Sequence, residues 1–105
     1  MQNDNDGAIA DFTEAIRLDP TFAQAYVSRG VARGDDAAAM EDYSEAIRLN
    51  PDYLQAYYNR GFMRGAAGDF VGAIEDFTQI LQRHPDHPQA RNMRLDIAEW
   101  RSGLE

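Results

Sequence analysis

One ten-residue stretch occurs three times in this chain, and it constrains the fold more than any other feature. Residues 11–20 read Asp-Phe-Thr-Glu-Ala-Ile-Arg-Leu-Asp-Pro, and residues 42–51 repeat them almost unchanged. Residues 76–85 are a looser third copy, and the closing prolines lie 31 and then 34 residues apart. A period in the thirties is typical of helical repeats that bury their apolar faces only against their neighbours. The sequence therefore predicts an all-α solenoid.

The composition excludes several classes of function. A net charge of −8 argues against a nucleic-acid binder, which needs a basic surface, and against docking to anionic lipid. There is no cysteine, so thiolate metal sites and cysteine nucleophiles are excluded. No apolar run approaches the roughly 20 residues of a membrane span, and the polar N-terminus does not resemble a secretory signal. We therefore expect one soluble, cytoplasmic domain over residues 1–105.

Apolar residues recur at helical spacing along the whole chain and predict six helices. Prolines end three of them, because the residue before a proline is displaced from the helical region. We expect Thr21 to cap the second helix by accepting a hydrogen bond from an unpaired backbone N–H. The predicted units are a half repeat over residues 4–20, a shortened repeat over 21–51, a full repeat over 52–85 and a capping helix over 86–105.

Small and aromatic residues at fixed offsets resemble the tetratricopeptide repeat. The matching sets are Tyr26, Gly30, Ala39, Tyr43, Ala46 and Pro51, then Tyr57, Gly61, Gly68, Asp69, Phe70, Ala73, Phe77 and Pro85, and the half copy Ala8, Phe12, Ala15 and Pro20. The resemblance covers roughly residues 4–85 and implies antiparallel helix pairs followed by a capping helix. We expect these positions to form the core, with glycine and alanine allowing close helix approach, and to carry no chemistry.

The chain departs from the family pattern in three places. Ile80 stands where the pattern has alanine, so helix packing near the C-terminal end should loosen or shift. The half repeat lacks its N-terminal partner helix, so Ile9, Phe12 and Ile16 should be partly exposed and invite association. The turn between the paired helices of the middle repeat is three residues shorter than in the next repeat. Either a tight hinge forms with Asp36 as a helix cap, or residues 22–49 fuse into one helix and a domain-swapped homodimer results. The hinge comprises Gly34, Asp35 and Asp36.

In the tetratricopeptide family the first helix of each pair lines a concave groove that contacts extended peptides or partner helices. By alignment, the groove residues here are Gln24, Val27, Ser28, Val31, Gln55, Tyr58, Asn59 and Phe62, with Gly65 and Ala66 at the rim. Tyr58 and Phe62 share one helical face, and such an aromatic pair gives contact area at low entropic cost. The alternative is that Phe62 and Val31 pack together and are not accessible.

The resemblance also bears on one particular ligand. Some family members hold the acidic C-termini of heat-shock chaperones in a carboxylate clamp, and this chain resembles that clamp only at Asn59. The clamp lysines are absent, and Phe62 and Val31 stand where polar groups are needed. We therefore do not expect binding of chaperone tails.

Two arginine pairs recur at an interval of 31 residues, namely Arg29 with Arg33 and Arg60 with Arg64. Such pairs can grip a carboxylate-rich partner. We favour pairing within the chain instead, because acidic residues recur with the same period and outnumber the arginines. The candidate partners are Asp11, Asp42, Glu45, Glu75 and Asp76. Exposed pairs of this kind contribute only about 0–1 kcal/mol each.

No pattern indicates catalysis. His84, Asp86 and His87 share a loop, but a metal site there would still need another ligand and a defined geometry. The sequence contains no catalytic triad order and no phosphate-binding loop. We expect neither an enzyme, nor a cofactor, nor a bound metal. The predicted function is a scaffold that binds a protein or peptide segment in the groove. The alternative is a structural assembly or dimerisation module that uses the half repeat and the shortened hinge and has no separate ligand.

Overall fold

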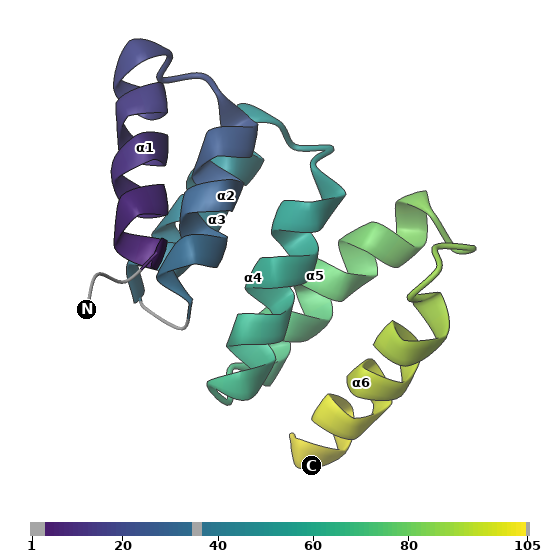
Figure 1. The fold of residues 1–105 in the computed structure, drawn as a ribbon. Helices are drawn as coiled ribbons and strands as arrows, with labels where there is room; N and C mark the ends of the chain where they lie inside the picture. Colours follow the sequence, from purple (N-terminus) through teal and green to yellow (C-terminus); the bar gives the residue numbers. More distant parts are fainter. Residues whose placement is uncertain (1–3, 35–36, 105) are drawn as a thin grey trace. The chain divides into compact units, whose positions relative to one another are not determined.

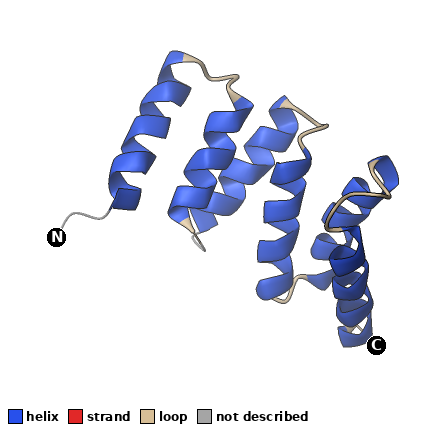
Figure 2. Cartoon of the chain, turned by 45° about the vertical axis from the view of Figure 1, so that its right-hand side comes forward, coloured by secondary structure: helices blue, strands red, loops and turns tan. Residues whose placement is uncertain are grey.

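The fold was analysed in a computed structural model that describes residues 4–34 and 37–104. This part of the chain contains six helices and no strand (Figures 1 and 2). The helices are α1 (Asp4–Leu18), α2 (Ala23–Arg33), α3 (Ala37–Leu49), α4 (Leu54–Ala66), α5 (Phe70–Arg83) and α6 (Ala90–Gly103). The predicted all-α class is confirmed, and the prolines fall just after helix ends as expected.

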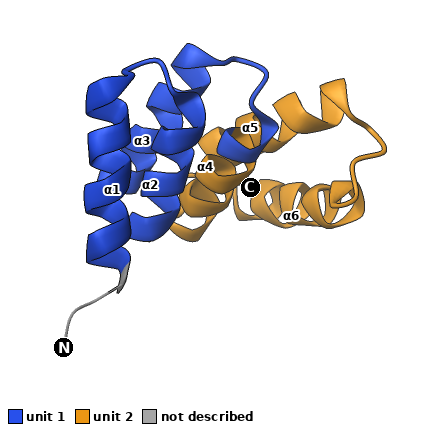
Figure 3. Ribbon diagram, turned by 45° about the horizontal axis from the view of Figure 1, so that its top comes forward, with its two compact units in different colours: residues 1–56 blue, residues 57–105 orange. Residues whose placement is uncertain are grey.

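The chain forms two compact units, residues 1–56 and residues 57–105 (Figure 3). The first unit holds α1, α2 and α3, and the second holds most of α4 together with α5 and α6. This division does not test the repeat boundaries expected from the sequence, which stay predictions.

In the first unit, α2 packs against both α1 and α3, and a glycine allows the close approach of α3. A Cβ atom on Gly30 would lie 2.6 Å from the ring of Tyr43, which is far inside van der Waals contact. Tyr43 is buried, together with the small residues Ala39 and Ala46 on the same face of α3. The predicted core role is therefore confirmed for Gly30, Ala39, Tyr43 and Ala46, whereas Tyr26 is only half-buried.

The second unit repeats this packing and extends it with α6. A Cβ atom on Gly61 would lie 2.8 Å from the fully buried ring of Phe77. Trp100 of α6 packs 5.0 Å from Phe77, measured between ring centroids, and it also covers Gly65 so closely that a Cβ atom there would collide with the indole. Gly65 is buried, so its predicted place at the rim of a groove is wrong, whereas Ala66 is exposed.

The start of α2 differs from the sequence prediction. Phe22 occupies the N-cap position without a side-chain hydrogen bond, so the prediction that Thr21 caps the helix is wrong. Thr21 instead donates to the Asp19 carboxylate from its hydroxyl (2.7 Å) and from its backbone N–H (3.1 Å). These two hydrogen bonds lower the pKa of Asp19 below its ordinary value. The turn is thus closed by an Asx-type motif immediately before the helix.

The first residue of the shortened hinge, Gly34, ends α2. α2 ends at Arg33, and Gly34 adopts a φ of +75°, with its N–H donating to the carbonyls of Gly30 and Val31. A positive φ strains any residue other than glycine, so Gly34 is suited to this position. The single helix over residues 22–49 is not formed in this structure. Asp35 and the proposed cap Asp36 lie outside the described residues, and the domain-swapped homodimer stays an untested prediction.

Candidate functional site

The residues predicted from α2 form an accessible face with one exception. Gln24 and Val31 are exposed, Val31 to 60%, and Ser28 is half-buried. Val27 is only 5% exposed, so its side chain belongs to the core and the expectation of an accessible Val27 is wrong. Positions 24, 28 and 31 lie on one side of the helix because they are separated by four and three residues.

The residues predicted from α4 form a second face, which belongs almost entirely to the second unit. Phe62 is 55% exposed, Tyr58 and Asn59 are half-buried, and Gln55 is exposed. Phe62 and Val31 belong to different units, so the alternative in which they pack together stays a prediction.

Phe62 is the outer member of a row of aromatic rings. Tyr58 stacks on Phe62 with ring centroids 6.4 Å apart, and on its other side it stacks on Phe77 at 5.5 Å. Phe77 in turn contacts Trp100. Phe77 is fully buried, so its ring holds Tyr58 in place. Because Tyr58 also stacks on Phe62, the Phe62 side chain has little conformational freedom to lose on binding. Sequence reasoning found Tyr58 and Phe62 but missed Trp100, because α6 carries no copy of the repeat motif.

Each arginine pair forms salt bridges with one buried aspartate. Asp42 is 3% exposed and accepts from Arg29 (2.7 Å) and Arg33 (2.8 Å), all within the first unit. The hydrogen bond from Arg29 to Asp42 raises the pKa of this arginine, which therefore stays charged. The predicted pairing within the chain is confirmed, but the acids are buried rather than exposed.

The second unit contains the same arrangement. Asp76 is 2% exposed and accepts from Arg60 (2.8 Å) and Arg64 (3.1 Å). Of the other candidate acids, Glu45 pairs with Arg48 on the surface, whereas Asp11 and Glu75 form no ion pair with any residue that the structure describes. The four arginines of the two pairs are thus occupied and do not form a ladder for an acidic ligand.

The histidine loop shows no metal-binding geometry. His87 Nδ1 accepts a hydrogen bond from the backbone N–H of Gln89 at 3.0 Å, which fixes the imidazole in the loop. Among residues 4–34 and 37–104, no group of three histidine, aspartate or glutamate side chains is placed to hold a metal ion. No helix in the same part of the chain has the length and apolar character needed to cross a membrane.

Family models and solved structures match the chain. A model described as TPR repeat matches residues 1–34 and 31–68, and one described as tetratricopeptide repeat matches residues 55–87. The first TPR of Spaghetti (RPAP3) bound to the HSP90 peptide SRMEEVD is 27% identical, with a TM-score of 0.83 over 96% of this chain and 80% of that one. The TPR2B domain of yeast Sti1, in a complex with pHsp70, is 20% identical, with a TM-score of 0.80 over 95% and 85%. No curated protein matches.

Proposed function

Because the chain belongs to the tetratricopeptide repeat family, we propose that it is a non-catalytic scaffold that binds an extended peptide segment of a partner protein. The observation that carries the proposal is Phe62, which is 55% exposed yet braced through Tyr58 by the buried ring of Phe77. A bound peptide in the Spaghetti domain, which shares this fold, supports the same class of ligand here.

The α4 face suits an apolar peptide side chain. Phe62 and Tyr58 provide a fixed aromatic surface, and burying such a surface dominates the energy of small interfaces. Gln55 and Asn59 flank the pair, and their amides can donate to and accept from a peptide backbone. The peptide segment therefore carries at least one large apolar residue, which rests on Phe62.

The α2 face provides a second contact surface of the same kind. Val31 is its exposed apolar residue, and Gln24 and Ser28 lie on the same side of the helix. We assign Val31 the role of an apolar contact for the peptide segment and Gln24 and Ser28 the role of polar contacts.

An acidic chaperone tail is not the proposed ligand. The chain has no lysine, and its two arginine pairs bind Asp42 and Asp76. Withdrawing an arginine from a buried carboxylate would leave that charge unpaired, which is strongly unfavourable. Selectivity for apolar over acidic segments follows from the same contacts that hold the helix pairs together.

The test is selection from a displayed library of random peptides, followed by affinity measurement on the selected sequences. We expect peptides with a large apolar residue to bind the wild-type chain and to lose at least about tenfold in affinity with the double variant Tyr58→Ala, Phe62→Ala, which removes an aromatic anchor. Val71→Ala is the matched control, because Val71 is also 55% exposed but lies on α5.

The outcomes separate the scaffold from the assembly module. Lost peptide binding at unchanged molar mass supports the scaffold. If the double variant binds every selected peptide as the wild type does, or if no peptide is enriched, the proposal is wrong. A changed molar mass without any loss of ligand would favour the assembly alternative.

A further inference from the structure

The first unit shows how one helix of this chain docks on another through an acidic residue. α3 contacts α2 through Asp42 and Tyr43, and Ala39 and Ala46 on the same side of α3 are also buried. The Asp42 carboxylate accepts from Arg29, which also donates to the Thr13 hydroxyl of α1 at 3.2 Å. Three helices therefore meet at Arg29, and an aspartate fills the position between them.

α1 carries the same docking residues as α3, and among the described residues none forms an ion pair with its aspartate. Residues 11–18 copy residues 42–49, so that Asp11 and Phe12 correspond to Asp42 and Tyr43. Asp11 is exposed, and Phe12 is only partly buried, as are Ala8 and Ala15. In the part of the chain that the structure describes, Asp11 has no ion-pair partner. The predicted partial exposure of Ile9, Phe12 and Ile16 on α1 is thus confirmed.

α6 carries a counterpart of the arginine on α2 that receives Asp42. Arg94 follows Arg60 by 34 residues, and Arg60 follows Arg29 by 31, which are the same two intervals that separate the prolines. Arg94 is exposed, and so are its neighbours Leu95 (60%) and Ala98. Its guanidinium donates to the carbonyl of Pro85 at 2.9 Å and makes no salt bridge within the described residues.

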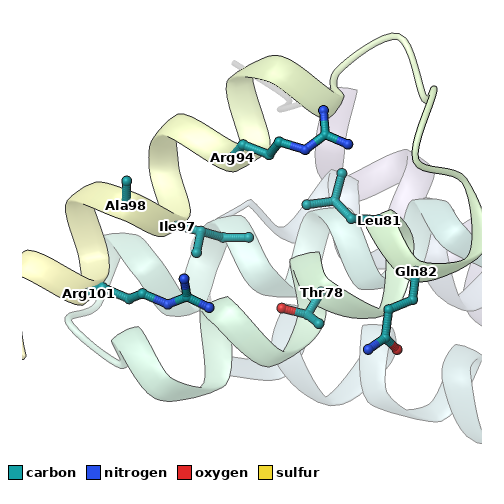
Figure 4. Close-up of a pocket in the computed structure, with 7 residues that line it drawn as sticks. All are labelled: Thr78, Leu81, Gln82, Arg94, Ile97, Ala98 and Arg101. Atoms are coloured by element: carbon teal, nitrogen blue, oxygen red, sulfur yellow. The ribbon is translucent and has the colours of Figure 1, made fainter.

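α5 and α6 enclose an open pocket of about 330 Å³ at this face (Figure 4). Its apolar floor and two arginines are contributed by Thr78, Leu81, Gln82, Arg94, Ile97, Ala98 and Arg101. Thr78 is the repeat counterpart of Thr13, just as Arg94 is the counterpart of Arg29. The pocket thus contains the counterparts of Thr13 and Arg29, with no carboxylate among its lining residues.

We propose that α1 of one molecule docks on the α5–α6 pocket of a second copy, with the Asp11 carboxylate received by Arg94. Arg101 lies seven residues beyond Arg94 on α6 and supplies further positive charge at the other end of the pocket. Because the two faces differ, the contact is heterologous and builds open chains or rings rather than closed pairs. The inference does not depend on peptide binding by the α2 and α4 faces.

Two residues of α6 differ from their counterparts in α2, and both differences should make this contact weaker than the α2–α3 contact. Leu95 stands where Gly30 admits Tyr43, so Phe12 must pack beside a leucine instead of against the backbone. Ala98 stands where Arg33 provides a second hydrogen bond to the carboxylate. We therefore expect a transient association with a dissociation constant on the order of 10–1,000 µM, as for small interfaces.

The test is sedimentation equilibrium on the full chain between about 10 µM and 1 mM, a range that brackets weak association. We expect the average mass of the wild type to rise with concentration. Asp11→Arg and Arg94→Glu should each weaken association by at least about tenfold, because each places like charges together. Both substitutions in one chain should restore it, since the opposite charges are then exchanged.

Matched controls carry the same charge changes elsewhere. Glu41→Arg and Arg48→Glu on α3 alter exposed residues outside both faces and should leave the wild-type association unchanged. Circular dichroism checks the helix content of each variant. If a charge reversal lowers it, Asp11→Asn and Arg94→Gln repeat the test with side chains of similar size.

Three results would overturn the proposal. The first is a wild type that stays monomeric up to the highest concentration. The second is association that survives Asp11→Arg or Arg94→Glu, as a domain-swapped dimer at the hinge would. The third is a double variant that stays monomeric although both single variants fold, because the restored charge pair is then not the contact that holds the copies together.

Discussion

The buried carboxylate of Asp76 gives a prediction whose size follows from its contacts. Asp76 is 2% exposed and accepts three hydrogen bonds, from Arg60 Nε (3.0 Å), Arg60 Nη2 (2.8 Å) and Arg64 Nη1 (3.1 Å). Asp76→Asn keeps the shape of the side chain but removes its charge and replaces one acceptor oxygen with a donor. The asparagine amide then faces an arginine N–H group without an acceptor between them.

The expected loss is about 2–4 kcal/mol of unfolding free energy. Removing one member of a buried ion pair typically costs about 3–5 kcal/mol. The side chains of Arg60 and Arg64 are 16% and 26% exposed and can recover some hydration, which places the expected value at the lower end. Domains of this size have a total stability of about 5–15 kcal/mol, so the melting temperature should fall by roughly 10–20 °C.

The measurement is urea unfolding followed by circular dichroism and by the fluorescence of Trp100. Trp100 contacts Phe77, the residue after Asp76, so its fluorescence reports on the same unit. Glu14→Gln is the control, because the Glu14–Arg17 pair is more than half exposed and its loss should not shift the midpoint measurably. If Asp76→Asn unfolds at the wild-type midpoint, desolvation of the carboxylate offsets its hydrogen bonds and the reasoning is wrong.

Three further predictions test other contacts. Gly61→Ala should destabilise the chain by about 1–3 kcal/mol in urea unfolding because its Cβ atom would overlap Phe77, whereas Gly7→Ala, with nothing within 4 Å, should be neutral or stabilising. Labelled SRMEEVD peptide should show no binding in fluorescence polarisation, and saturable micromolar binding would refute the proposed selectivity. Burial and then the charge of Glu99 raise the pKa of Asp96, so its ionised form is disfavoured on folding. Asp96→Asn should therefore raise the melting temperature at pH 7, and this gain should shrink as acidification protonates the wild-type carboxyl.

The sequence was sufficient to predict those features that repeat. Six helices, the glycine–aromatic contacts at Gly30 and Gly61, and pairing of the arginines within the chain all follow from positions that recur with the period. A residue that occurs at the same place in two copies faces the same neighbours in both, so pattern alone identifies Asp42 and Asp76 as candidate partners. Their burial could not be predicted, because each stands beside an acidic residue, Glu41 or Glu75, and the sequence does not distinguish the buried carboxylate from the exposed one.

Features that depend on a single contact were not predictable. Trp100 covers Gly65, yet nothing in the capping helix marks which of its residues faces α4. Val27 is buried although it aligns with groove positions, since the accessible stripe on α2 is narrower than the family alignment suggests. Thr21 has the chemistry of an N-cap, but its hydroxyl and its N–H both donate to Asp19. The N-cap is then Phe22, one residue later.

The distribution of charge connects the two proposals. Each buried cluster combines two arginines with one aspartate and so holds one excess positive charge, which makes the rest of the molecule more acidic than its net charge of −8 indicates. An acidic surface repels acidic ligands, which favours an apolar peptide on the α4 face. Arg94 and Arg101 line the α5–α6 pocket, and neither forms a salt bridge within the described residues. An exposed carboxylate such as Asp11 is therefore attracted to this pocket, while the remaining acidic surface disfavours other modes of self-association.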